Sequence, residues 1–304
     1  MKVLVTGGTG FVGEEILRQL HRAGHRVRAL VRDPNSRSSQ RIKAEFEAEL
    51  SPGNILDTTS LRSFFSSGEA VIHLVGIISE IGANTFEAVH FRGTQNVVAA
   101  AKDSGVRRYI QMSALGTRAD AVARYHKSKW AGEEAVRNSG LNYTIFRPSI
   151  IYGRGDMFTN LFAKMARWSP VLPVIGPGQG TMQPLPVECV AECFVKALSE
   201  PLSIGKTFDL VGPDVLTLNE VLDCILVATG RKRLKLHVPL PLARAMAAFL
   251  EIIYPRILRK APPLNRDQII MLQEQTIGDR QPMQEILKVF APELRKGIDY
   301  LGKL

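Results

Sequence analysis

Three residues in this sequence have the types and spacing needed to move a proton to or from a substrate oxygen: Ser113, Tyr125 and Lys129. Tyr125 and Lys129 are four positions apart in a predicted helix that runs to Ser139, so the two side chains share one helical face. An ammonium beside a phenol is expected to lower the phenol pKa from its usual value of about 10. Such a phenol exchanges a proton with a carbonyl or an alcohol while a nicotinamide transfers a hydride. Ser113 ends the preceding predicted strand and would orient the substrate oxygen.

The first residues of the chain predict a site for the nicotinamide cofactor. An apolar strand begins at Lys2 and ends in the turn Gly7-x-x-Gly10-x-x-Gly13, and a predicted helix follows over residues 14–23. In this pattern the first glycine allows a tight bend, the second lets the backbone approach a pyrophosphate, and the third lets the helix pack on the strand. The free N–H groups of the helix N-terminus favour phosphate. We therefore expect dinucleotide binding.

The second predicted strand, over residues 25–31, indicates which dinucleotide is bound. Proteins that bind NAD usually place Asp or Glu at the end of this strand, where it bonds the ribose 2′-hydroxyl. Here Val31 ends the strand and Arg32 follows it, and an arginine pairs with a 2′-phosphate and stacks on adenine. The sequence favours NADP(H), although NAD(H) stays an alternative because Asp33 can still reach the ribose.

Predicted strands and helices alternate through the first half of the chain. Further strands are predicted at 70–76, 108–113 and 142–148, and helices begin near residue 58 and span 86–104 and 125–139; residues 48–50 fit either a strand or a helix. Such alternation is typical of a parallel sheet with helices on both faces, and ligands then bind beyond the carboxyl ends of the strands. We predict an α/β fold with a Rossmann-type doubly wound parallel sheet. His73, inside a predicted strand, is expected to be a core histidine with satisfied hydrogen bonds.

The pattern changes near residue 150. Prolines and glycines interrupt residues 153–186, and predicted helices follow at 187–199, 218–229 and 241–253. We expect an NADP(H)-binding Rossmann domain over residues 1–152, to which a segment at about 180–215 returns. Residues 153–304 are expected to form a smaller C-terminal α/β lobe that shapes the substrate or partner site.

The composition is that of an ordinary globular protein with a basic surface. The net charge is +10, but no basic stretch is interleaved with aromatic residues, which argues against a nucleic-acid surface. Cys189, Cys193 and Cys224 have no histidine at ligand spacing, so buried thiols in a reducing compartment are expected rather than a metal site. The chain enters a core strand at once and has no long uncharged apolar run, so we predict neither a signal peptide nor a membrane-spanning helix, and we expect a cytoplasmic protein.

One segment of the second half has a membrane-surface alternative. The basic cluster from Arg231 to Lys235 precedes the segment from Leu240 to Leu258, which is apolar apart from a few charged residues. A basic, amphipathic pair of segments can lie on a membrane surface. The other interpretation is a helix that faces the core beside a solvated loop, and the sequence leaves both open.

Together these features resemble the short-chain dehydrogenase/reductase superfamily, in the extended or atypical branch that includes nucleotide-sugar epimerases. The resemblance covers essentially the whole chain. It implies that Thr6 to Gly13 binds pyrophosphate, that Asp57 beside Leu56 contacts adenine, that the end of the fourth strand lies over the adenine ribose, and that the segment from Arg147 to Gly153 lines the nicotinamide. The expected cofactor-binding residues are Gly7, Thr9, Gly10, Phe11, Val12, Gly13, Arg32, Leu56, Asp57, Leu74, Val75, Gly76, Met112, Tyr125, Lys129, Arg147, Pro148 and Ile150, and the expected catalytic residues are Ser113, Tyr125 and Lys129.

Within that superfamily the sequence is most similar to the subgroup of the nucleotide-binding accessory subunit of respiratory complex I. His90 stands where sugar epimerases carry Asn, and residues 112–116, 125–130 and 263–272 suit the subgroup. The resemblance implies a tightly held NADP(H) and weakens the expectation of turnover. Many epimerases carry a second hydroxyl after Ser113, and here that position is Ala114.

Two functions therefore stay open. The first is an NAD(P)(H)-dependent oxidoreductase or epimerase-like enzyme that acts on a small-molecule substrate through Tyr125 and Lys129. The second is a cofactor-holding accessory, assembly or sensor protein without turnover, bound at the membrane periphery or to a respiratory complex. By family resemblance a helix-mediated homodimer is also expected.

Overall fold

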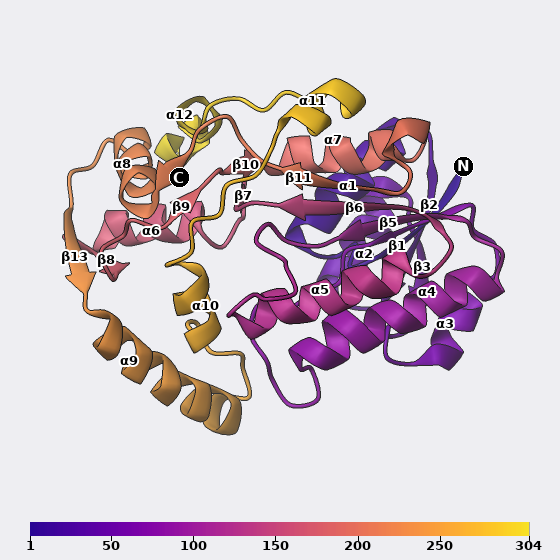
Figure 1. Cartoon of the computed structure of the whole chain (residues 1–304), viewed down its shortest axis with the longest axis horizontal. Helices are drawn as coiled ribbons and strands as arrows, with labels where there is room; N and C mark the ends of the chain where they lie inside the picture. The colour runs from indigo at the N-terminus through magenta and orange to yellow at the C-terminus, as the bar shows by residue number, and fades with distance from the viewer. Residues whose placement is uncertain (304) are drawn as a thin grey trace.

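Seven parallel strands form the central sheet of the computed structural model, which describes residues 1–303 (Figure 1). The strands lie in the order β11-β6-β5-β4-β1-β2-β3, and every neighbouring pair is parallel. Their bounds are β1 (Lys2–Thr6), β2 (Arg26–Val31), β3 (Glu49–Pro52), β4 (Ala70–His73), β5 (Arg108–Met112), β6 (Asn142–Pro148) and β11 (Lys206–Leu210). This is the Rossmann strand order, so the predicted fold class is confirmed.

Helices cover both faces of the sheet, which explains why its strands are apolar on both sides. Alternate residues of β1 enter different cores: Val3 and Val5 pack on one face and Leu4 on the other. On the first face lie α1 (Phe11–Arg22), α2 (Arg37–Phe46) and α7 (Val187–Ala197), and on the second lie α3 (Thr58–Phe64), α4 (Gly93–Asp103) and α5 (Arg124–Arg137). Cys189 and Cys193, both on α7, are buried free thiols, as expected.

Three elements differ from the sequence prediction. The polar stretch after Asp33 contains α2, which buries little more than Ile42 and Phe46. Residues 48–50, which fit either a strand or a helix, lie at the start of the strand β3. The predicted strand over 70–76 ends at His73 because the following residues leave the sheet. The predicted helix over 86–104 begins as a π-helix, η1 (Glu87–Arg92), before α4.

A further hydrophobic core lies beyond the carboxyl ends of the strands. It is built mainly on α6 (Thr159–Trp168) and α8 (Leu218–Ala228). The remaining elements of this part are β7 (Ile151–Tyr152), β8 (Val171–Ile175), β9 (Thr181–Met182), β10 (Leu185–Pro186), η2 (Pro201–Ser203), β12 (Leu216–Thr217), β13 (Leu234–Val238), α11 (Gln281–Leu287), α12 (Leu294–Gly297) and η4 (Asp299–Lys303). The basic cluster from Arg231 to Lys235, for which a solvated loop is one of two interpretations, includes the start of a strand, because β13 begins at Leu234 and pairs with β8.

The chain between β13 and α11 forms an arm. It consists of α9 (Leu240–Ile253), the π-helix η3 (Tyr254–Leu258) and α10 (Arg266–Met271). Figure 1 shows α9 apart from the sheet, with α10 between α9 and the strand ends. Within residues 1–303 no helix combines the length and apolar character needed to cross a membrane, and no group of three or more His, Cys, Asp or Glu side chains is arranged to hold a metal ion.

Candidate active site

The glycine turn lies at the carboxyl end of β1, against the end of β4. Gly7 has φ of 81°, and a Cβ at that residue would lie 3.2 Å from the Cβ of Leu74. A Cβ at Gly13 would clash with the carbonyl oxygen of Gly7. Both positions therefore require glycine, and the turn is held close to the segment that follows β4.

The same turn fits the pyrophosphate of a dinucleotide. Gly10 caps α1 without any side-chain hydrogen bond to the helix. The N–H groups of the first helical turn have no acceptor within the helix, and no side chain stands above them at Gly10. Phe11 lies beside Gly153: a Cβ added at Gly153 would be 3.1 Å from the Phe11 ring. Val12 packs against the core, and Thr9 is half-buried. Backbone amides at a helix N-terminus suit phosphate, so the residues present can hold this part of the cofactor.

The end of β2 leaves a basic side chain exposed. Arg32 makes no hydrogen bond or ion pair within residues 1–303. The Asp33 carboxylate accepts a hydrogen bond from the N–H of Asn35 at 2.9 Å, so it is engaged in its own loop. Asp57 is likewise engaged, because it caps α3 by accepting from the N–H of Thr59 at 3.0 Å.

Lys129 lies where β4, β5 and α5 meet. It is buried, and its Nζ donates to the carbonyl oxygen of Met112 at 3.3 Å. A Cβ at Gly76 would lie 2.9 Å from the same Nζ. Ser113 follows Met112, is buried, and has its Oγ 3.4 Å from the Thr117 Oγ1. The structure therefore brings Gly76, Met112, Ser113 and Lys129 to one edge of the sheet.

The ring of Tyr125 lies among three other rings. Its centroid is 5.8 Å from that of Phe86, 5.3 Å from that of His90 and 5.4 Å from that of His126, each in an edge-to-face arrangement. The phenol oxygen has no hydrogen-bond partner within residues 1–303. Burial raises the pKa of Tyr125 to about 12, so the lowering expected from the Lys129 charge is wrong.

Lys129 itself has the more perturbed pKa. Burial lowers the pKa of its ammonium from 10.5 to about 8, and the carboxylate of Glu133, one turn further along α5, partly opposes that change. The helix α5 thus carries a buried amine whose charge is costly to keep, one turn after Tyr125.

His90 connects the segment after β4 to α5. Its Nε2 accepts a hydrogen bond from the N–H of Ile77 at 3.0 Å, and its Nδ1 lies 2.8 Å from the Oγ of Ser128. Ser128 Oγ donates to the carbonyl oxygen of Tyr125 at 2.7 Å, so His90 must donate from Nδ1. Burial lowers the pKa of His90 to about 2, which keeps the ring neutral.

A second buried histidine links the glycine turn to the same region. His73 Nδ1 lies 2.6 Å from Thr6 Oγ1, and its Nε2 lies 3.3 Å from Thr94 Oγ1. Thr94 Oγ1 in turn donates to the carbonyl oxygen of His90 at 2.7 Å. Burial lowers the pKa of His73 to about 3. The expectation of a satisfied core histidine is confirmed, but sequence reasoning missed its connection to Thr6 and Thr94, because the three residues come from separate elements.

Arg147 is engaged by the protein rather than left free at the site. Its Nε and Nη2 donate to the two carboxylate oxygens of Glu133 at 2.8 and 2.6 Å, and its guanidinium lies 5.9 Å from the ring centroid of Trp130. Glu133 is fully buried. A contact between Arg147 and a nicotinamide stays a prediction.

The other predicted cofactor residues lie along the ends of the strands. Pro148 is buried, and its carbonyl oxygen accepts from the N–H of Leu115. Ile150 packs against the core beyond the strand ends, whereas Leu56 packs against the core of the sheet. Val75 is half-buried next to Leu74. Their contacts with a nucleotide stay predictions.

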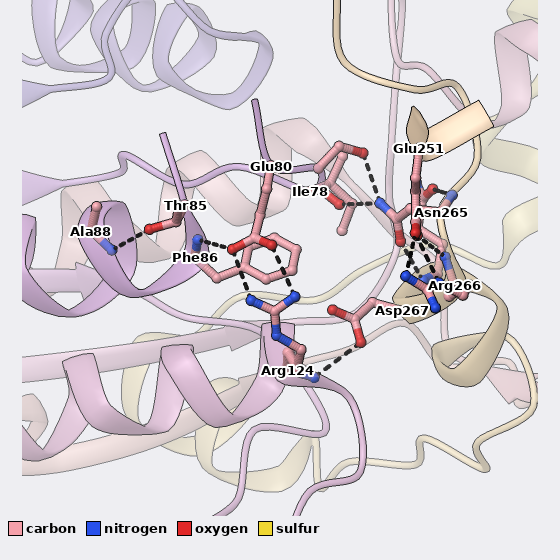
Figure 2. Close-up of polar contacts among 12 residues, drawn as sticks. Ile78, Glu80, Thr85, Phe86, Ala88, Arg124, Glu251, Asn265, Arg266 and Asp267 are labelled. Carbon is pink, nitrogen blue, oxygen red and sulfur yellow. Dashed lines mark hydrogen bonds and ion pairs between the residues drawn. The ribbon is translucent and has the colours of Figure 1, made fainter. Parts of the chain in front are cut away.

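The arm contacts two segments near Tyr125, the loop after β4 and the start of α5 (Figure 2). Asn265, which caps α10, donates from Nδ2 to the carbonyl oxygen of Ile78 at 2.8 Å. Asp267 accepts from the N–H of Arg124 at 3.1 Å, and Arg124 pairs with Glu80 at 3.0 Å. Residues distant in sequence thus hold both the loop after β4 and the start of α5.

The fold and this site define a Rossmann-type dinucleotide-binding protein with a Tyr-x-x-x-Lys helix. Residues 3–210 match the model of the NAD dependent epimerase/dehydratase family, and the chain belongs to that family. The resemblance stated from the sequence is confirmed.

Two relatives and one solved structure illustrate what this chain is similar to. The chain is 31% identical over 289 residues to NADH dehydrogenase [ubiquinone] 1 alpha subcomplex subunit 9 of Arabidopsis thaliana, covering 90% of this chain and 70% of that protein. It is 36% identical over 174 residues to a ceramide reductase of Caulobacter vibrioides, covering 57% of this chain and 53% of that protein. UDP-glucose 4-epimerase of Thermotoga maritima superposes with a TM-score of 0.78 at 19% identity over 100% of this chain and 98% of that one, which shows a shared fold.

Proposed function

We propose that this protein is an NADP(H)-dependent reductase in which Tyr125 donates a proton to the oxygen of a substrate carbonyl. The observation that carries the proposal is the placement of Tyr125: its phenol is protonated at neutral pH, as for an ordinary tyrosine, and it has no hydrogen-bond partner within residues 1–303 that would compete with a substrate oxygen. A phenol that stays protonated at neutral pH is a proton donor, which is the role that carbonyl reduction needs.

The chain's own residues supply positioning and proton transfer. A bound nicotinamide would supply the hydride. The Gly7–Gly13 turn would hold the pyrophosphate, and Lys129, beside Gly76 and Met112, would bond a ribose hydroxyl and offset negative charge that develops on Tyr125. Ser113 would orient the substrate oxygen.

The 2′-phosphate of NADP(H) is the finer part of the cofactor proposal. Exposed Arg32 follows β2 with no partner within residues 1–303, while Asp33 is engaged by Asn35. A free guanidinium at this strand end favours a 2′-phosphate over a bare 2′-hydroxyl.

Reduction is favoured over sugar epimerisation for two reasons. Ala114 carries no hydroxyl where many epimerases place a second donor. The partial relative named as a ceramide reductase supports carbonyl chemistry, and it directs the choice of test substrates towards long-chain carbonyl compounds.

A second candidate function rests on the relative that covers most of the chain. Because the plant protein is by name a subunit of NADH dehydrogenase, this chain is alternatively an accessory protein that holds NADP(H) without turnover, with a respiratory complex as its partner. The missing hydroxyl at Ala114 supports this alternative as well.

One experiment distinguishes the two. The purified protein is denatured and the released nucleotide identified by mass spectrometry, and NADPH oxidation is then followed with aliphatic ketones and long-chain aldehydes. Turnover that falls by at least about 100-fold in Tyr125→Phe, with NADPH affinity unchanged, supports the reductase. Stoichiometric NADP(H) that resists exchange, with no oxidation of NADPH, supports the accessory role. Failure to bind either nucleotide contradicts both proposals.

A further inference from the structure

One side of the arm presents a row of apolar side chains to solvent. Leu242, Met246, Phe249 and Ile252 are spaced so that they share one side of α9, and each is about half exposed or more, with Phe249 at 63%. Ile257 and Leu258 of η3 continue the row, with Ile257 at 68%. We call these six residues the α9 outer face.

The opposite side of α9 is attached to the protein through a small core. Ala243 and Ala247 are buried there against Ile269 of α10. Alanine side chains allow the two helices to approach, and the buried residues of α9 are these two alanines. Several adjacent apolar side chains left exposed in this way mark an interaction surface rather than scattered surface residues.

The charges around this face have one sign. Glu251 is the one acidic residue between positions 240 and 260, and it accepts from the backbone N–H and the Nε of Arg266, both at 2.8 Å, so it is turned towards α10 (Figure 2). Arg256, Arg259 and Lys260 are exposed at the far end of the row. The face therefore combines an apolar row with cationic side chains and lacks an acidic side chain directed outward.

We propose that the α9 outer face docks on an anionic lipid leaflet, with α9 lying in the plane of the interface. An apolar row a few turns long buries in the boundary between acyl chains and headgroups, and the adjacent Arg256, Arg259 and Lys260 reach the lipid phosphates through their long aliphatic stems. A net charge of +10 adds long-range attraction to the same surface. An apolar protein partner would bury the row equally well, but it would not by itself account for the three cations at its end.

The arm also connects this surface to the candidate active site. α9 packs on α10, and the α10 cap Asn265 binds the loop after β4 through Ile78. Docking would therefore place the loop that precedes His90 and Tyr125 near the lipid surface. This inference is independent of turnover, because it concerns a face that contains none of the proposed catalytic residues.

The test is co-sedimentation of the full-length protein with vesicles. Phosphatidylglycerol mixed with phosphatidylcholine in equal amounts is compared with phosphatidylcholine alone, at low and high salt. We expect binding to the anionic vesicles that weakens with salt and falls at least about 10-fold in Met246→Glu/Phe249→Glu, because two exposed apolar side chains that docking would bury in the bilayer are replaced by carboxylates. Arg259→Glu/Lys260→Glu is expected to remove most of the preference for the anionic vesicles.

The control is Met157→Glu/Val227→Glu, which changes two apolar residues elsewhere on the surface that are more exposed, at 91% and 73%, than Met246 and Phe249, at 48% and 63%. All three double variants should retain the wild-type melting temperature and NADPH affinity, which separates loss of docking from loss of fold. Wild-type protein that stays in the supernatant, or equal losses in the α9 variant and the control, overturns the proposal. A dimer in solution that becomes a monomer in Met246→Glu/Phe249→Glu also overturns it, because the face then belongs to a second copy of this chain.

Discussion

His90 Nε2 accepts a hydrogen bond from the backbone N–H of Ile77 at 3.0 Å, and this bond fixes the loop after β4 to the π-helix η1. The same ring reaches α5 through Ser128, and its face packs against Phe86, 5.6 Å between centroids, with Tyr125 edge-on. A neutral imidazole therefore acts here as a positioning group that ties the cofactor side of the site to the candidate proton donor.

Removing the imidazole is expected to destabilise the protein. His90→Ala leaves the Ile77 N–H without its acceptor, removes the donor to the Ser128 hydroxyl and opens a cavity, so the free energy of unfolding should fall by roughly 2–4 kcal/mol in urea denaturation. His90→Asn can still accept from one donor and should lose less. His21→Ala, at an exposed position on α1, is the control. Equal stability of His90→Ala and the control would contradict the positioning role.

The two buried histidines should make the protein sensitive to mild acid. Burial lowers the pKa values of His73 and His90 from 6.5 to about 3 and about 2, so in the folded protein both rings stay neutral where the unfolded chain is protonated. Stability is complete above pH 6.5 and is lost as the pH falls below it, by up to about 1.4 kcal/mol per pH unit for each ring. Urea denaturation from about pH 7 to about pH 5 measures this slope.

The slope should decrease in His90→Asn, which removes one of the two titrating rings, and should be unchanged in His21→Ala. A wild-type stability that is flat over this range would show that neither ring is held neutral by the fold.

Most of the sheet could be predicted from the sequence because its signals are local. The turn from Gly7 to Gly13 and the apolar runs that became β1, β4 and β5 each depend on adjacent residues. The elements that were missed have weak local signals: α2 is mostly polar, and β13 is a strand only because it pairs with β8, more than fifty residues earlier in the chain.

The candidate site was only partly predictable for the same reason. Types and spacing indicated Ser113, Tyr125 and Lys129, but a pKa depends on what buries the group. Tyr125 packs against Phe86 and His90, and His90 in turn bonds Ile77 of the loop that the distant Asn265 holds through Ile78. Burial therefore sets the direction of the pKa shift of Tyr125, and that direction could not be read from a four-residue motif.

Arg32 is expected to select the nucleotide. Arg32→Glu removes the exposed guanidinium at the end of β2 and puts a carboxylate near the expected 2′-phosphate, so NADPH affinity should fall by at least about 10-fold while NADH affinity changes little or rises. Titrations with both nucleotides measure the ratio. The matched control is Arg37→Glu, which changes a nearby exposed arginine on α2. An equal loss of NADPH affinity in both variants would indicate a general electrostatic effect of the charge change rather than a specific contact of Arg32.

Lys129→Met is expected to stabilise the fold and impair its function. Because burial lowers the pKa of Lys129 from 10.5 to about 8, the folded protein holds its ammonium at a cost of roughly 3 kcal/mol below pH 8, and methionine fills a similar volume without a charge. The free energy of unfolding of the wild type should rise between about pH 8 and 10.5, and that of Lys129→Met should stay flat and lie higher at neutral pH.

Function should change in the opposite direction, because the methionine can neither bond a ribose hydroxyl nor offset charge on Tyr125. NADPH affinity is expected to weaken, and NADPH oxidation to fall by at least about 100-fold. Lys127→Met, two positions earlier and exposed, is the matched control for the loss of one positive charge. If Lys129→Met is less stable than Lys127→Met, the ammonium has partners in the fold that outweigh its burial, and the cause assigned to its lowered pKa is wrong.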